Sequence, residues 1–182
     1  MEFSKAWLHC SDSPYGSALI FNEWHKARGW GGIGYHFVVG NGWTSPDMQA
    51  PWGALDGCIE AGRALDDDRD CESAEVGAHV YGFNSGSVGV VLVGKTKFTM
   101  MQLLHSRSLL IELSNRLGFP LEEVYGHYEA GLLDARYATT KTCPNIPMEH
   151  YRDYLLYKIS TDELVAAIAE HNNPLSPPTE HG

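Results

Sequence analysis

Residues 88–94 read VGVVLVG, a run of seven residues without a polar side chain. An apolar run of this length is typical of a central strand that is buried on both faces. A sheet with two buried faces needs helices on both sides, so this segment favours an α/β fold.

Helix and strand patterns alternate along the rest of the chain. The clearest helix follows the apolar run, because Thr99 and Gln102 form a capping box and Gly118 ends the leucine-rich pattern. An earlier helix starts at Ser17, and we expect Ile20 and Trp24 to share one face of it. Further strands are expected at 5–10, 33–40, 58–63 and 122–129, and further helices at 146–159 and 160–171.

This alternation predicts a single α/β domain with a central mixed β-sheet flanked by helices. We place the domain at residues 1–172. Residues 173–182 have little to bury and are predicted to form a mobile C-terminal tail.

Charge and hydropathy exclude several classes of function. The formal net charge of −10, from 13 basic and 23 acidic residues, leaves no basic excess to bind nucleic acid or an anionic membrane surface. No apolar run is long enough to span a bilayer, and the N-terminus has no signal-peptide pattern. We therefore expect a monomer made in a cytoplasm, where the four cysteines are thiols.

Histidine is frequent, with nine residues, and four histidines lie at or near predicted strand ends: His9, His36, His79 and His127. Catalytic zinc sites use three ligands drawn from histidine, cysteine and carboxylate. His9, His127 and Cys143 would make such a set, although the 16 residues from His127 to Cys143 match no compact finger pattern. On the residues alone, Cys143 could equally be a metal ligand or an ordinary buried thiol.

The neighbours of these candidates have simpler expected roles. Cys10 and His36 should point to the opposite side of their strands from His9 and Tyr35 and be structural. Pro144 should hold the chain extended after Cys143. The acidic run at 66–70 lacks the glycine and terminal glutamate of a calcium loop, which favours a solvated turn.

Seven motifs carry a family resemblance that covers roughly residues 5–150. In chain order they are LHCSDSP, WHKARGWGGIGYHFVV, EAGR, GAHVYGFNSGSVGVVLVG, FTMMQLLHSRSLL, GHYE and KTCPN. The set resembles the zinc-dependent N-acetylmuramoyl-L-alanine amidases of type 2, which share their fold with the peptidoglycan recognition proteins. It looks closest to the small phage lysis amidases.

The resemblance implies a zinc ion in a surface groove, with His9, His127 and Cys143 as ligands. It also implies catalytic roles for Tyr35 and Lys141. Two parts of the chain look longer than in the minimal family pattern: the segment between His127 and Cys143, and the loops within 43–75. The resemblance therefore does not define the shape of the groove.

Three other residues near these motifs have less specific roles. His79 is expected to line the groove and touch substrate or to orient a zinc ligand. Asn84 is assigned to substrate binding with it, beside a tight loop for which a backbone role is the simpler interpretation. Glu129 is an outside candidate for the general base.

The implied function is hydrolysis of the amide between N-acetylmuramic acid and L-alanine in bacterial peptidoglycan, for cell lysis after release from the host cytoplasm. A non-catalytic peptidoglycan-binding protein of the same fold is the alternative, although such proteins typically lack the cysteine ligand. Two further hypotheses remain. The protein could be a cysteine hydrolase that uses Cys143 as nucleophile, or a regulator that binds a polymerase.

Overall fold

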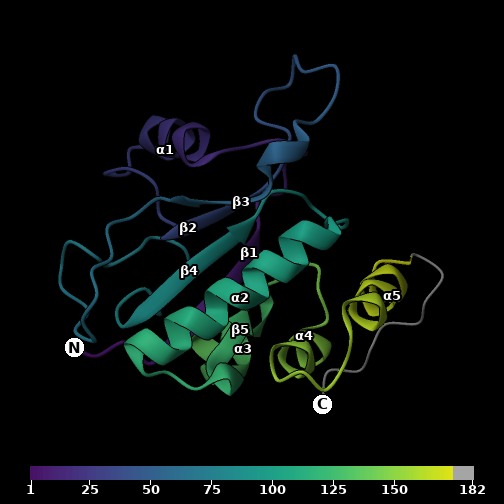
Figure 1. The fold of residues 1–182 in the computed structure, drawn as a ribbon. Helices are drawn as coiled ribbons and strands as arrows, with labels where there is room; N and C mark the ends of the chain where they lie inside the picture. The colour runs from purple at the N-terminus through teal and green to yellow at the C-terminus, as the bar shows by residue number, and fades with distance from the viewer. Residues whose placement is uncertain (174–182) are drawn as a thin grey trace.

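A computed structural model describes residues 1–173 and shows a five-stranded mixed sheet in the order β3–β2–β4–β1–β5 (Figure 1). The predicted mobile tail, apart from Asn173, lies outside the described residues. The strands are β1 Lys5–Cys10, β2 Phe37–Asn41, β3 Asp56–Ala61, β4 Ser87–Leu92 and β5 Val124–Gly126.

Four of the strands run parallel, and β3 pairs antiparallel with β2 at one edge. Cys10 at the end of β1 pairs with Leu92 at the end of β4, and Leu92 also pairs with Val39 of β2. The carboxyl ends of the three strands therefore lie together, at the edge where ligands bind in sheets of this kind.

Helices cover both faces of the sheet (Figure 1). They are α1 Ala18–Ala27, α2 Met100–Leu117, α3 Ala130–Leu133, α4 Met148–Leu155 and α5 Thr161–His171, with 3₁₀ turns η1 Gly53–Leu55, η2 Leu121–Glu123, η3 His127–Glu129 and η4 Ala135–Tyr137. In Figure 1, α2 lies across the strands, with α4 and α5 to one side of it. None of the described helices is long and apolar enough to cross a membrane.

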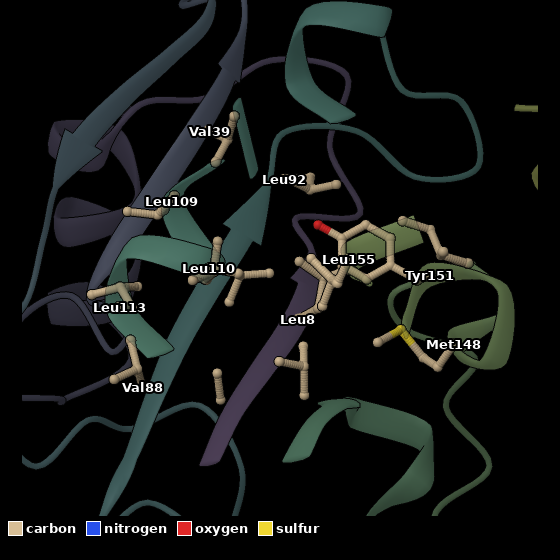
Figure 2. Close-up of a cluster of buried hydrophobic side chains, with 14 of the residues drawn as sticks. Leu8, Val39, Val88, Leu92, Leu109, Leu110, Leu113, Met148, Tyr151 and Leu155 are labelled. Carbon is tan, nitrogen blue, oxygen red and sulfur yellow. The ribbon is translucent and has the colours of Figure 1, made fainter. Parts of the chain in front are cut away.

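The apolar run of the sequence is the central strand β4, buried at every position. Val88 and Leu92 pack on the main core with α2 and α4, whereas Val91 packs on a second core with α1. Figure 2 shows the main core, where side chains of β1 and β4 meet Leu110 and Leu113 of α2 and the side chains of α4. This alternation confirms the prediction of a sheet covered on both faces.

The helix ends follow the predicted capping signals. Thr99 and Gln102 form the capping box of α2, and Gly118 ends that helix with a positive φ of 86°. Ser17 caps α1 as predicted, but the buried residues of α1 are Phe21 and His25. Ile20 and Trp24, which were expected to share one face, are half-buried and both pack against the cluster that contains Phe21.

The acidic run forms an exposed turn. Oδ1 of Asp66 accepts a hydrogen bond from N of Asp68, and Oδ1 of Asp68 accepts one from N of Asp70. Among the described residues, the only group that could hold a metal ion lies elsewhere. The predicted solvated turn agrees with this arrangement.

Candidate metal centre and active-site cleft

Three side chains from distant parts of the chain meet at the carboxyl edge of the sheet. His9 lies near the end of β1, His127 directly follows β5, and Cys143 comes from the loop before α4. One donor atom from each lies within 4.8 Å of the others, and Sγ of Cys143 is 3.7 Å from Nδ1 of His9. Two imidazoles and one thiol in this arrangement fit a zinc ion with a fourth position left for another ligand.

The sheet explains why His9 and His127 come together. Because β1 and β5 are parallel neighbours, with Leu8 paired to Gly126, the residues that follow each pair emerge side by side. The ring centroids of His9 and His127 are 5.0 Å apart. A rigid sheet thus fixes two of the three candidate ligands.

The loop that carries Cys143 turns back sharply. N of Asn145 donates to O of Thr142 over 2.7 Å, so these residues form a turn. The prediction that Pro144 keeps the chain extended after Cys143 is therefore wrong. The turn lets N of Tyr128 donate to O of Cys143 over 3.0 Å, which ties the third candidate ligand to the segment of the second.

Cys10 also departs from its predicted role. It is buried, but its side chain contacts that of Cys143, and its backbone N donates to Sγ of Cys143 over 3.3 Å. Sγ of Cys10 accepts from Nδ2 of Asn145 over 3.4 Å. The alternation rule fails here because Cys10 is the last residue of β1, where the regular strand ends.

The electrostatic surroundings keep both histidines neutral. Burial, followed by the neighbouring His79 and His127, lowers the pKa of His9 well below its usual value. Burial and then Lys141 lower the pKa of His127 to about 4. Neutral imidazole is the form that binds a metal ion, so both side chains are ready as ligands at neutral pH.

Cys143 needs a cation to become a thiolate. The Cys10 side chain and burial raise the pKa of its thiol, whereas the backbone N–H of Cys10 and the Lys141 ammonium act in the opposite direction. A bound metal ion would deprotonate such a thiol outright. The donor chemistry of the cleft therefore fits a divalent ion held by His9, His127 and Cys143.

Tyr35 and Lys141 both line the cleft of about 450 Å³ that contains these ligands. The Tyr35 ring lies 5.2 Å from the His9 ring between centroids, and burial raises the pKa of its phenol. Tyr35 therefore stays a hydrogen-bond donor at neutral pH. Lys141 is exposed, two residues before Cys143.

His79 lines the same cleft but is buried, and its Nδ1 lies 3.4 Å from Nε2 of His9. Asn84 lies outside the lining of the cleft. Its Oδ1 accepts hydrogen bonds from N of His79 and N of Val80, over 2.8 and 2.9 Å. Asn84 thus holds the loop that carries His79, and its contact with substrate stays a prediction.

Glu129 has a structural role. It is buried, and both of its carboxylate oxygens accept from the Arg152 guanidinium, over 2.9 and 3.0 Å. One of them also accepts from N of Gly126. All of these contacts are with residues outside the lining of the cleft, so the structure gives no support to Glu129 as the general base. His36 is buried and hydrogen-bonded to Gly89 and Glu75, which agrees with its predicted structural role.

Several residues of the cleft were not found by reasoning from single residues. His25, Arg28 and Trp30 line it from the end of α1, and His25 accepts from N of Gly34 through Nδ1. His25 lies within a helix, so a search for histidines at strand ends does not find it. The RGWGG segment that ends α1 was the available signal, because a helix that stops at glycine leads into a loop, and loops often carry binding residues.

Fold and site together define a class: an α/β domain with a His–His–Cys group that could hold a metal ion at the carboxyl edge of a mixed sheet. Comparison with known proteins gives the family. The model of the family described as N-acetylmuramoyl-L-alanine amidase (Amidase_2) matches residues 2–146. The chain therefore belongs to the N-acetylmuramoyl-L-alanine amidase family, as its motifs predicted.

Individual relatives agree with this assignment. The endolysin of Klebsiella phage KP32 is 32% identical over 162 residues, which cover 82% of this chain and 85% of the relative. The solved amidase LysC of Clostridium intestinale has a similar fold, with a TM-score of 0.62 at 22% identity over 86% of this chain and 87% of that one. Peptidoglycan recognition protein-LE, solved with a diaminopimelic acid-type peptidoglycan fragment, has a TM-score of 0.53 at 21% identity, over 79% of this chain and 75% of that one.

Proposed function

We propose that the chain is an endolysin-type enzyme that uses zinc to hydrolyse the amide between N-acetylmuramic acid and L-alanine in bacterial peptidoglycan. The His9, His127 and Cys143 group at the base of the cleft is the observation that carries the proposal. Relatives that are endolysins support a role in lysis, and a solved relative bound to peptidoglycan supports the substrate.

Amide hydrolysis needs a nucleophile, a polarised carbonyl and a proton for the departing amine. Zinc held by the three ligands would supply Lewis acidity toward the carbonyl and a lower pKa for water. Lys141, as an ammonium at the rim, would stabilise negative charge on the carbonyl oxygen or protonate the amine. The Tyr35 phenol, kept protonated by burial, would donate a hydrogen bond to the same oxygen.

The proposal is tested by digesting purified diaminopimelate-type peptidoglycan with and without a zinc chelator and identifying the soluble products by mass spectrometry. Stem peptides with a free N-terminal alanine are expected, lost on chelation and restored by zinc. Cys143→Ser should abolish release, whereas Cys58→Ser, a half-buried thiol on β3, should not. Cut glycan or shortened peptides would instead show that another bond is the target.

Binding without catalysis is the second candidate. It would appear as protein that sediments with the cell wall while releasing no product. The presence of Cys143 among the candidate ligands argues for catalysis, because the site then has a complete set of three donors. Activity that resists chelation but is lost on thiol alkylation would point to Cys143 as a nucleophile.

A further inference from the structure

A second cavity adjoins the metal cleft at the carboxyl edge of the sheet. We call it the hairpin pocket. Its volume is about 770 Å³, against about 450 Å³ for the cleft, and falls in the range of ligand-binding pockets. Asp12 and Lys95 line both cavities, so the two are neighbours at the ends of β1 and β4.

Three loops build the hairpin pocket and are joined to one another by hydrogen bonds. The loop after β1 contributes Tyr15, the loop after β2 contributes Trp43, and the loop after β4 contributes Thr96. N of Gly16 donates to O of Trp43 over 2.9 Å, and Nδ2 of Asn41 donates to O of Pro14 over 2.9 Å. These contacts fix the walls before any ligand arrives, which lowers the entropic cost of binding.

The two cavities differ in chemistry. In the metal cleft, Arg28 and Lys141 have no ion-pair partner among residues 1–173. In the hairpin pocket the Lys95 ammonium is paired with Asp12 over 2.7 Å, which leaves one other charged residue in the lining, Lys97. The rest of the lining consists of neutral groups, among them the aromatic residues Tyr15 and Trp43.

The two parts of the proposed substrate, the stem peptide and the glycan, differ in the same way. The stem peptide carries free carboxylates, which suit the unpaired cations of the cleft. The glycan is rich in hydroxyl and acetamido groups and loses the muramyl carboxylate to the amide. Apolar surface with a few placed polar groups is the usual surface for a ligand of that kind.

We propose that the hairpin pocket binds the sugar residues of the glycan that flank the scissile muramyl amide. This inference rests on the proposed amidase function and adds a second binding region to it. A glycan that occupies the pocket would help to place the amide at the metal, because binding energy remote from the reacting bond improves its positioning.

The test compares two soluble substrates with the same stem peptide, one on a chain of two disaccharide units and one on N-acetylmuramic acid alone. Trp43→Ala is expected to raise KM for the glycan-bearing substrate about five- to tenfold more than for the minimal one. Ser45→Arg, which would fill the pocket from its rim, should give the same difference. Trp52→Ala is the matched control, because Trp52 is 63% exposed on the same loop and does not line the pocket.

Direct binding gives an independent measurement. A tetramer of N-acetylglucosamine should bind the wild-type protein, shift the backbone resonances of Trp43 and Thr96 in NMR, and bind Trp43→Ala about tenfold more weakly. If the Trp43→Ala and Ser45→Arg variants raise KM equally for both substrates, the pocket binds the peptide and the proposal is wrong. The proposal is also wrong if neither variant raises KM and the wild-type protein does not bind the tetramer. Failure of the wild type to cleave either substrate would count against the amidase function itself.

Discussion

Nδ1 of His79 lies 3.4 Å from Nε2 of His9, while the other nitrogen of the His9 ring faces Cys143. His79 is therefore placed to accept the Nε2–H proton of His9, which would leave Nδ1 of His9 as the atom that binds a metal ion. Outer hydrogen bonds of this kind fix the tautomer and orientation of a ligating histidine. The geometry favours the positioning role over direct contact with substrate, because the His79 ring is buried.

His79→Phe should weaken zinc binding about tenfold to hundredfold while leaving the fold intact. The substitution keeps a ring in the space but removes the acceptor of the His9 proton. Zinc affinity is measured by competition with a chromogenic chelator, which does not depend on activity. His79→Gln, which keeps an acceptor, should recover part of the affinity, and His150→Phe on the exposed face of α4 should have no effect. Unchanged zinc affinity in His79→Phe would remove the positioning role.

The room for the His79 ring comes from glycine. A Cβ on Gly89 of β4 would lie 2.6 Å from Cδ2 of His79, and one on Gly77 would lie 2.5 Å from the same atom. Neither contact is possible without moving the ring or the strand. The His79 site therefore depends on the sequence of the central strand as well as on its own loop.

Lys141→Met should lower kcat about a hundredfold and change zinc affinity little. The reason is that its ammonium borders the cleft without being a ligand, so its loss removes stabilisation of charge on the reacting amide. Steady-state kinetics on a soluble muropeptide gives kcat and KM separately. Lys158→Met is the control, because Lys158 is an exposed lysine that pairs with Asp153 and does not line the cleft. This variant should leave kcat and KM unchanged. A change in KM alone would instead assign Lys141 to substrate binding.

Arg152→Met should lower the free energy of unfolding by about 3 kcal/mol, because it leaves the buried Glu129 carboxylate without its bidentate partner. Urea unfolding measures the loss. Adding Glu129→Gln to this variant should recover much of it, since no buried charge then remains.

Two controls accompany the Arg152 variant. Arg136→Met breaks the exposed pair with Asp134 and should lower the free energy of unfolding far less than Arg152→Met does. Glu129→Gln alone should retain kcat within about threefold, because the carboxylate serves the fold. A loss of kcat near a thousandfold in a folded Glu129→Gln protein would restore Glu129 as the general base.

Local signals in the sequence were enough for most of the fold and for naming the candidate metal ligands. Two of these signals are local, because the capping box at Thr99 and the apolar run of β4 each involve only a few neighbouring residues. The third is the order of the seven motifs, which matches a family pattern. For the same reason His9, His127 and Cys143 could be named before their distances were known. Their grouping in the structure agrees with that prediction.

The errors lie where distant segments meet or where a regular element ends. Strand alternation could not place Cys10, because it is the last residue of β1 and a neighbour from another loop lies beside it. The contact between His79 and His9 joins residues 70 positions apart, which no local pattern encodes. Helical spacing gave Ile20 and Trp24 a shared face on α1, but it did not single out Phe21 and His25 as the residues buried most deeply there.

Acid should destabilise the protein partly through His36. Burial lowers its pKa from 6.5 to about 4, so the unfolded chain binds a proton at this residue that the folded chain does not. The stability from neutral His36 is complete above pH 6.5 and is lost as the pH falls toward 4, by about 2 kcal/mol at pH 5. Its Nδ1 accepts from N of Gly89, and its Nε2 lies 2.7 Å from O of Glu75.

His36→Asn keeps an acceptor for the Gly89 N–H but cannot titrate. It should be less stable than the wild type at pH 7, and the gap should close by about 2 kcal/mol at pH 5, because only the wild type pays for the proton. Urea unfolding at pH 7, 6 and 5 measures the gap, and pH effects on the other histidines cancel in the difference. A constant gap for His36→Asn would show that His36 binds the same number of protons in the folded and unfolded states.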